Sequence, residues 1–260
     1  IDNSDSSDAD DAISIEGDRV WVHIADVASY VDINSVLDLY AQKRASNLYL
    51  PDQILHMLPP KISDVCSLGI GEISNAVSVG FLMNDSEISD IKIYLSQIKV
   101  TKMSYEEADK SLHENISLSM LNKIAKDHKK NRDSNGAIRL DLPKTDIKVK
   151  DQKVLVLPQL HSESREMVSE MMVLAGRVIA HYSIENNISM PYLSQASGKF
   201  SEEIIENINN LSLSKAFEAA KGFSRSKLSV TPSLHAGLGL EAYIRVTSPM
   251  RRYLDIVVQQ

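Results

Sequence analysis

The sequence predicts a mixed α/β (α+β) domain in which strand pairs alternate with helices. Residues 12 to 33 and residues 76 to 100 each contain two runs of apolar, often β-branched residues around a polar break, which is typical of antiparallel hairpins. Residues 163 to 187 instead repeat their apolar side chains at helical spacing. Strand pairs followed by helices favour a sheet packed by helices.

The N-terminal half is expected to open with a hairpin that turns at residues 16 to 18, where Glu, Gly and Asp interrupt the apolar run. Residues 35 to 50 carry apolar side chains near helical spacing, and Pro51 follows them. This pattern predicts a helix that leads directly to Tyr49. The second hairpin is expected to turn at residues 84 to 87, a short polar stretch.

Further along the chain, three helical regions are expected. Residues 104 to 132 alternate lysine and glutamate with leucine and isoleucine, which indicates a surface helix or a helix pair. The segment "DIVVQQ" at the end of the chain is helical in pattern. Within residues 163 to 187, one helical face gathers apolar side chains that we expect in the core: Met167, Met171, Leu174, Val178 and Ile179.

Composition limits the class of protein. The 260 residues are 43% hydrophobic, enough for a sizeable core, and no apolar run is long enough to cross a bilayer, so no membrane partner is expected. A single cysteine, Cys66, favours a reduced intracellular compartment and a buried thiol. The net charge of -7 argues against a globally basic nucleic-acid-binding surface, but not against a basic channel. Because Ile stands first, we expect a fragment of a longer protein.

Five aspartates lie within the first eleven residues, without one basic residue among them: Asp2, Asp5, Asp8, Asp10 and Asp11. Crowded carboxylates raise one another's pKa unless water or a cation neutralises them. A calcium loop starting at Asp5 is excluded, since the ligand and glycine positions do not match. A magnesium site and a solvated acidic stretch both remain open. The strand-like run that follows at once favours the site.

Four separate stretches carry a resemblance to a known family. "IDNSDSSDADDAISIE" with "VWVHIADVASYV", then "SNLYLPDQILHMLPPKISDVCSL", "SREMVSEMMVLAGRVIAHYSIENN" and "HAGLGLEAYIRVTSPMRRYLD" resemble, in this order, the catalytic (RNB) domain of the ribonuclease II family, which includes ribonuclease R and Dis3. The resemblance extends over residues 1 to 260 as one domain, with a mixed β-sheet packed by helices around an RNA channel. "VSEMMVLAG" and "RVTSPMRRYLDIVVQQ" look closest to the cyanobacterial and plastid branch.

The resemblance implies an activity and a cofactor. Enzymes of this family degrade single-stranded RNA processively from its 3′ end and release nucleoside 5′-monophosphates with Mg²⁺. Asp2, Asp8, Asp10 and Asp11 match the four acidic positions, and Asp5 falls outside the pattern. One or two Mg²⁺ ions, about 4 Å apart when paired, would activate water and stabilise the leaving oxygen. Asp2 and Asp11 are the firmest expected ligands; Asp8 binds directly or through water, and Asp10 orients a metal or the terminal nucleotide.

The resemblance also assigns RNA contacts. Arg251 in "TSPMRRY" matches the catalytic arginine, and Arg252 is its competitor, with an ion pair or a phosphate contact as alternatives. Arg245 is expected in the same channel. Tyr49 matches the tyrosine that stacks on the 3′-terminal base, whereas local pattern alone would place it in the core. Leu140 stands where many members have the opposite aromatic, for which Tyr192 is a possible substitute.

Other polar residues have simpler interpretations. His23 and Asp26 are expected in structural hydrogen bonds rather than in a metal pair. His235 is expected either to have a helix-cap or packing role or to contact RNA. "GLGLEAY" lacks the third glycine of a phosphate-binding loop. Gln259 stands where many members have histidine.

The expected whole protein is a monomer that carries OB-type RNA-binding domains in the same chain, in the cytoplasm or alternatively in a chloroplast or mitochondrion. A catalytically inactive RNA-binding relative of the same fold is the alternative to an enzyme. The presence of all four acidic positions and of Arg251 favours the enzyme.

Overall fold

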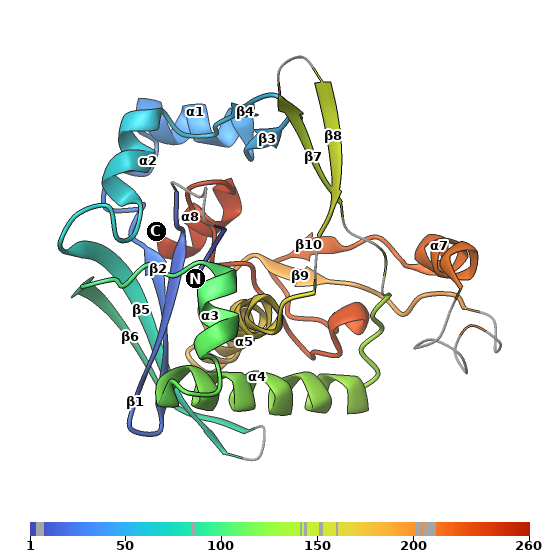
Figure 1. The fold of residues 1–260 in the computed structure, drawn as a ribbon. Helices are drawn as coiled ribbons and strands as arrows, with labels where there is room; N and C mark the ends of the chain where they lie inside the picture. Colours follow the sequence, from blue (N-terminus) through green and yellow to red (C-terminus); the bar gives the residue numbers. More distant parts are fainter. Residues whose placement is uncertain are drawn as a thin grey trace.

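The computed structural model describes residues 1–3, 8–84, 87–140, 142, 145–150, 153–159, 161–200, 204 and 212–260. Asp5 lies outside these residues, so the expectation about it has no structural counterpart. Figure 1 shows one body in which a twisted sheet is covered by helices, with both chain ends near its centre.

A four-stranded sheet in the order β1-β2-β5-β6 forms the base of the fold. Each neighbouring pair in it is antiparallel, so the expected mixed sheet is instead an antiparallel one. The physical reason is that only two residues separate β1 from β2 and β5 from β6, and so short a connection allows only antiparallel pairing within each of these pairs. Both predicted hairpins are therefore confirmed. The strands are β1 Asp11–Glu16, β2 Arg19–Ala25, β5 Ser74–Asn84 and β6 Glu87–Ile98.

The helices that cover the sheet match the predicted helical regions. The region 104 to 132 forms a pair, α3 Tyr105–Ser111 and α4 Ile116–Ser134, and α5 spans Glu163–Glu185. Helix α5 contacts β2, β5 and β6, while α4 packs on α5 and β1 (Figure 1). The methionine-rich face of α5 is buried as predicted: Met167, Met171, Leu174, Val178 and Ile179 are each at most 5% exposed.

A second apolar cluster lies where β2 ends. The elements that surround the acidic segment pack together in this cluster. Helices α1 Val36–Arg44, α2 Pro60–Cys66 and α8 Tyr253–Gln259 meet there. The predicted C-terminal helix is thus confirmed. The buried members of this cluster come from all parts of the chain: Ala25, Val27, Val31, Ala41, Met57, Leu58, Cys66, Leu68, Ala76, Met250 and Ile256.

The helix expected over residues 35 to 50 is shorter than predicted. It begins after its N-cap Ser35 and ends at Arg44, because Ala45 adopts a positive φ of 61°, which a helix cannot accommodate. Tyr49 therefore lies on a two-residue strand and not at a helix end.

The remaining described elements are short strand pairs and short helices. They are β3 Leu48–Tyr49 with β4 Ile54–Leu55, β7 Thr145–Lys150 with β8 Lys153–Pro158, β9 Tyr192–Ser194 with β10 Lys227–Ser229, α7 Leu213–Gly222 and the 3₁₀ turn η2 Ala236–Leu238. No helix in the described part of the chain is both long enough and apolar enough to cross a membrane.

A buried charge network joins α4, α5 and the loop around η2. Arg132 donates from Nε and Nη2 to the two carboxylate oxygens of Glu170, at 2.7 and 2.6 Å, and from Nη1 to the carbonyl of Leu238 at 2.9 Å. Nδ1 of His128 lies 2.8 Å from the same carboxylate. Burial raises the pKa of Glu170, but the contacts with His128 and Arg132 outweigh it and lower this pKa to about 2.

Glu170→Gln is expected to lower the free energy of unfolding by about 1.5 to 3 kcal/mol at pH 7, because a charged hydrogen-bond partner of buried Arg132 is lost. The pKa of Glu170 is depressed in the fold, so its contribution is complete above about pH 4.5 and is lost as the pH falls toward about 2. Denaturant titrations should therefore show the two proteins converging in acid. The exposed Glu72 provides the control Glu72→Gln. Parallel curves over the whole pH range would contradict the assignment.

Candidate active site

The two ends of the chain meet at Asp10 and Arg251. The Asp10 carboxylate is only 6% exposed. Its Oδ2 accepts a hydrogen bond from Nε of Arg251 at 2.9 Å, and its Oδ1 accepts one from the backbone N–H of Met250, also at 2.9 Å. The sequence-predicted acidic segment and the predicted arginine are thus brought into direct contact across 240 residues.

Strand pairing explains why the acidic segment lies here. The N–H of Ala25 donates to the carbonyl of Asp10 at 2.8 Å, and Asp11 opens β1 opposite Ile24. On the other side, a turn holds Arg251, whose N–H donates to the carbonyl of Ser248 at 3.2 Å. Both partners of the Asp10 and Arg251 ion pair therefore come from rigid backbone.

Asp255 holds that turn in place. Its side chain is fully buried, and Oδ2 accepts the N–H of Ser248 at 2.9 Å and two N–H groups of Arg252 at 3.1 and 2.7 Å. Arg252 therefore forms the local ion pair that was one of its two sequence-based alternatives. It is half-buried, and its charge lowers the pKa of Asp11, so it remains close to the acidic segment.

Asp2 and Asp11 line one cavity of about 910 Å³, together with Asn3, His23, Lys99 and Lys102. Burial and the nearby Asp2 raise the pKa of Asp11 to about 6, against the opposing effect of Arg251. Burial also raises the pKa of Asp10 to about 7, against the opposing effect of Arg251. Both carboxylates thus lie where their negative charge is poorly solvated.

This donor set fits a hard cation. Carboxylate oxygens are the ligands that Mg²⁺ prefers, with water and phosphate completing its coordination. A cation held by Asp2 and Asp11 would offset the burial that raises the pKa of Asp11 and the smaller repulsion from Asp2. Among the described residues, no three His, Cys, Asp or Glu side chains are grouped closely enough to hold an ion by themselves. Of the four aspartates expected at the site, Asp2 and Asp11 line the cavity, and Glu107 of α3 lines it as well.

Asp8 is half-buried and is placed just before Ala9, whose carbonyl accepts the N–H of Leu68 at 3.0 Å. Within the described part of the chain, Asp8 has no hydrogen-bond or ion-pair partner. The structure therefore brings together Asp2 with Asp11 and Asp10 with Arg251, and leaves Asp8 beside them.

Tyr49 is exposed, at 55%, on the small β3–β4 hairpin. The prediction that local pattern alone suggested, a core tyrosine, is wrong. Its hydroxyl is one of the groups that raise the pKa of Arg251, after the larger opposing effect of burial and the contribution of Asp10. Tyr49 therefore presents a free ring close to Arg251.

Tyr192 and Arg245 are two other residues for which RNA contacts were predicted. Tyr192 is 2% exposed within the main core, where β9 pairs it with Ser229. It cannot stack on a base, so it is no substitute for an aromatic at Leu140, which is half-buried. Arg245 is exposed, and it lies close enough to His235 and Tyr243 for its charge to act on the pKa of each.

The residues with structural interpretations lie as expected. His23 hydrogen-bonds Ser14 and Ser78 across the sheet, at 2.9 and 2.6 Å. Asp26 accepts from the backbone and hydroxyl of Ser29, at 3.2 and 2.5 Å.

His235 is buried, makes an edge contact with the ring of Tyr243 and does not cap η2 with its side chain. Cys66 is buried, and burial raises the pKa of its thiol to about 12, which makes it a poor nucleophile.

Gln259 acquires a clear role. Its Oε1 accepts the N–H groups of Val27 and Ala28 at 3.1 and 3.2 Å, and its Nε2 donates to the carbonyl of Ala25 at 2.8 Å. An imidazole has one acceptor and one donor at most in its neutral form, so the amide is better suited to hold three backbone groups. Gln259 thereby supports the backbone that pairs with Asp10.

Sequence reasoning missed the residues that hold Asp2. The backbone of Asp2 exchanges hydrogen bonds with Met103 and Tyr105, both at 3.1 Å. The guanidinium of Arg165 lies 3.9 Å from the ring centre of Tyr105 and donates to Asn3 at 2.7 Å. The one available signal was the pattern Ser-x-x-Glu at residues 104 to 107, which forms a capping box at the start of α3.

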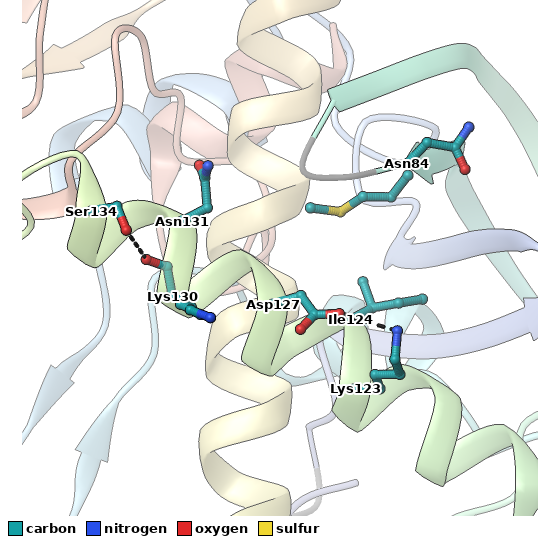
Figure 2. Close-up of a pocket in the computed structure, with 8 residues that line it drawn as sticks. Asn84, Lys123, Ile124, Asp127, Lys130, Asn131 and Ser134 are labelled. Atoms are coloured by element: carbon teal, nitrogen blue, oxygen red, sulfur yellow. Dashed lines mark hydrogen bonds and ion pairs between the residues drawn. The ribbon is translucent and has the colours of Figure 1, made fainter.

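A second cavity, of about 630 Å³, lies between α4 and the end of β5 (Figure 2). Its lining includes Met83, Asn84, Lys130 and the ion pair of Lys123 with Asp127 at 3.3 Å. None of the acidic residues of the N-terminal segment and no arginine lines it. It is therefore separate from the candidate active site.

Two curated relatives align with nearly the whole chain. An uncharacterised ribonuclease of Synechocystis is 35% identical over 99% of this chain and 40% of its own length. The chloroplastic/mitochondrial ribonuclease II of Arabidopsis thaliana is 31% identical over 98% of this chain and 34% of its own length. The chain thus spans well under half the length of these relatives.

Solved structures share the fold. The ribonuclease R of Mycoplasma genitalium without RNA superposes with a TM-score of 0.88 and 25% identity, over 99% of this chain and 48% of that one. Its complex with ribose-methylated single-stranded RNA gives a TM-score of 0.87 and 24% identity over the same shares. Yeast Ssd1, described as a pseudonuclease, shares the fold alone, with a TM-score of 0.71 and 18% identity over 96% of this chain and 36% of that one.

The family model of the RNB domain, which describes its sequence pattern, matches residues 1–260 in full. It agrees with the relatives and with the geometry, in which an N-terminal acidic segment meets a C-terminal arginine turn. The chain therefore belongs to the RNB-domain family of ribonucleases.

Proposed function

We propose that the protein is a Mg²⁺-dependent 3′-to-5′ exoribonuclease that hydrolyses single-stranded RNA processively to nucleoside 5′-monophosphates. The observation that carries the proposal is the contact between Asp10 and Arg251 at 2.9 Å beside a cavity that Asp2 and Asp11 line. A guanidinium and several carboxylates at one point are suited to phosphodiester hydrolysis, in which negative charge grows on phosphate oxygens.

Asp2 and Asp11 would hold the metal, with Asp8 as a further ligand directly or through water. One or two bound Mg²⁺ ions would supply an activated water and stabilise the leaving 3′ oxygen. The protein's own part is to keep both carboxylates in place. The backbone of Asp2 is held by Met103 and Tyr105, and Asp11 is held by its pairing with β2.

Arg251 has the role of stabilising the scissile phosphate. Nε is committed to Asp10, so the two terminal nitrogens of the guanidinium can turn toward the non-bridging phosphate oxygens. Asp10 then orients Arg251, since the N–H of Met250 fixes the other oxygen of the same carboxylate. This role for Asp10 adds to the expected one of orienting a metal or the terminal nucleotide.

Tyr49 would stack on the 3′-terminal base. Stacking accepts every base, which suits an enzyme that must process any sequence, and its ring is exposed beside Arg251. With Leu140 in place of an aromatic, Tyr49 would be the principal aromatic contact of that base. Arg245 and Arg252 would contact phosphates further along the RNA.

A catalytically inactive RNA-binding protein is the second candidate, because the pseudonuclease Ssd1 has the same fold. The presence of Asp2, Asp8, Asp10 and Asp11 together with Arg251 favours the enzyme. The two candidates differ in turnover and not in binding, so one assay separates them.

The test is to incubate the protein and Mg²⁺ with single-stranded RNA labelled at its 5′ end. Progressive shortening of the labelled strand and release of nucleoside 5′-monophosphates are expected, and both should stop when EDTA removes the metal. RNA bound without shortening would favour the inactive relative. Internal fragments of random length would contradict the exonuclease.

Tyr49→Ala is expected to weaken binding of the RNA 3′ end by about 1 to 3 kcal/mol, because one base–aromatic contact is lost. The dissociation constant measured by fluorescence anisotropy in EDTA should rise accordingly. Tyr94→Ala is the control, since Tyr94 is equally exposed, at 53%, on the edge strand β6. Equal effects of the two substitutions would remove the stacking role of Tyr49.

We further propose that the protein is a monomer with OB-type RNA-binding domains in the same polypeptide, and that it acts in the cytoplasm or in a chloroplast or mitochondrion. The family supports this arrangement, and the chain accounts for 40% and 34% of its two curated relatives. OB-type domains would provide the positive charge that this acidic chain lacks. Sedimentation of the protein and fluorescent tagging in cells test both points.

A further inference from the structure

The hairpin that carries Tyr49 is too small to hold its own position. Each of its strands has two residues, and only the pairs Leu48 with Leu55 and Tyr49 with Ile54 connect them. All four of these side chains are more than one third exposed. A two-stranded hairpin of this size is not stable in water without further support. Something at its base must therefore determine where the tyrosine ring lies.

Asn47 lies at that base, and its side chain is buried, at 9% exposure. Its Oδ1 accepts the backbone N–H of Met57 at 2.6 Å, and Met57 is fully buried in the second apolar cluster. One side-chain bond thus joins the residue just before the hairpin to the second residue after it. The loop between these two residues, including Tyr49, becomes closed and is anchored to the core.

The backbone of the same segment pairs with the arginine turn. The N–H of Asn47 donates to the carbonyl of Arg251 at 3.1 Å, and the N–H of Tyr253 donates to the carbonyl of Ala45 at 2.9 Å. Ser46 forms a bridge with Arg252 between these two bonds. Asn47 is therefore bonded on one side to Arg251 and on the other, through Met57, to the far end of the Tyr49 hairpin.

We propose that Asn47 is a positioning residue that sets the distance between the base-stacking ring of Tyr49 and the guanidinium of Arg251. This inference rests on the proposed function, because it assigns to Tyr49 the base and to Arg251 the phosphate of the same RNA end. Asn47 itself touches neither. It acts by closing the hairpin with its amide oxygen while its backbone is bonded to the arginine turn.

The chemistry explains why an acceptor is needed at this position. The N–H of Met57 is buried and would have no partner if the side chain were truncated, and a buried orphan donor is costly. The segment would relieve it by moving out to water, which carries Tyr49 away from Arg251. An aspartate at position 47 retains an oxygen at the same place, so it should preserve the hairpin.

The experiment uses a single-stranded RNA with 2-aminopurine as its 3′-terminal base, bound to the protein in EDTA so that no cleavage occurs. Stacking on Tyr49 quenches the fluorescence of this base. Asn47→Ala is expected to weaken binding of the labelled end about tenfold and to restore most of the fluorescence. Asn47→Asp should retain both the affinity and the quenching of the wild type.

The double substitution tests whether Asn47 acts through Tyr49. In the Tyr49→Ala protein, Asn47→Ala should have less than a twofold further effect, because residues that act as a unit are not additive. Asn75→Ala is the matched control: its amide is exposed on β5 and bonds only the exposed Gln97 within the described residues, so binding should not change.

Several outcomes would overturn the inference. It fails if Asn47→Ala leaves the quenching unchanged, or if Asn47→Asp loses the quenching equally. It also fails if the effects of Asn47→Ala and Tyr49→Ala on RNA binding multiply independently in the double variant. If Tyr49→Ala itself has no effect, the stacking role in the proposed function fails instead. If thermal melts show that Asn47→Ala does not fold, Asn47→Ser replaces it under the same criteria, since the shorter side chain of serine does not reach the N–H of Met57.

Discussion

Arg251→Lys is expected to lower kcat by about 10² to 10³-fold, the usual cost of losing one donor that stabilises a transition state. Lysine keeps the positive charge but has one ammonium in place of a fork. Its three N–H groups radiate from a single nitrogen, so they cannot reproduce the planar geometry in which Nε of the arginine bonds Asp10 while its terminal nitrogens face phosphate oxygens. RNA affinity should change by less than threefold. Single-turnover cleavage and anisotropy measure the two quantities separately.

Arg252→Lys is the matched comparison, because the neighbouring guanidinium is committed to Asp255 three residues further on. Its kcat should remain within about fivefold of the wild type, which is the range of a partly exposed local pair. If Arg252→Lys lowers kcat as much as Arg251→Lys, the assignment of the two arginines is reversed.

Asp10→Asn is expected to lower kcat by at least about 10²-fold without destabilising the fold. An amide can still accept the N–H of Met250, but it offers an N–H to Nε of Arg251 where an acceptor is required. Arg251 then loses its orientation. The reaction should slow while the protein stays folded, as measured by single-turnover kinetics and by circular dichroism.

The stability of the same variant follows from the raised pKa of Asp10. Burial raises it from 3.8 to about 7, so ionisation of Asp10 opposes folding progressively as the pH rises from about 4 to about 7. A neutral amide does not have this cost. At pH 8 without divalent cations, Asp10→Asn should therefore melt at the same temperature as the wild type or higher.

Asp18→Asn, in the exposed turn between β1 and β2, controls for the general effect of removing a negative charge. It should change neither kcat nor the melting temperature measurably. Full activity of Asp10→Asn would remove the role of Asp10 in orienting Arg251, and a large drop in its melting temperature would show that the pair is mainly structural.

The long elements could be predicted from sequence because their pattern is local. The α5 face with Met167 and Met171 repeats at helical spacing over six turns, and the two hairpins alternate around polar turns. The end of α1 could not be predicted, because it depends on Ala45 adopting a left-handed conformation, and alanine carries no local signal for one. The backbone pairing of residues 45–47 with 251–253 offsets the energetic cost of this conformation.

The acidic residues and Arg251 could be named from the sequence, but not their arrangement. The sequence places these aspartates in one short acidic segment. In the fold, Asp10 contacts Arg251, Asp2 and Asp11 line a cavity, and Asp8 does neither. These differences come from strand register and from burial, which depend on residues far along the chain. Asn47 and Arg165 escaped notice for the same reason, since an asparagine and an arginine without their partners have no distinguishing pattern.

By itself, then, the sequence determined the elements, the family resemblance and the residue types of the site, because periodicity and short motifs are carried by neighbouring residues. Only the tertiary structure decided which carboxylate faces which partner, that Tyr49 is exposed while Tyr192 is buried, and that Gln259 and Asn47 hold the backbone around the site. Those outcomes follow from contacts between segments up to 240 residues apart, and desolvation and hydrogen-bond geometry act only once these segments meet.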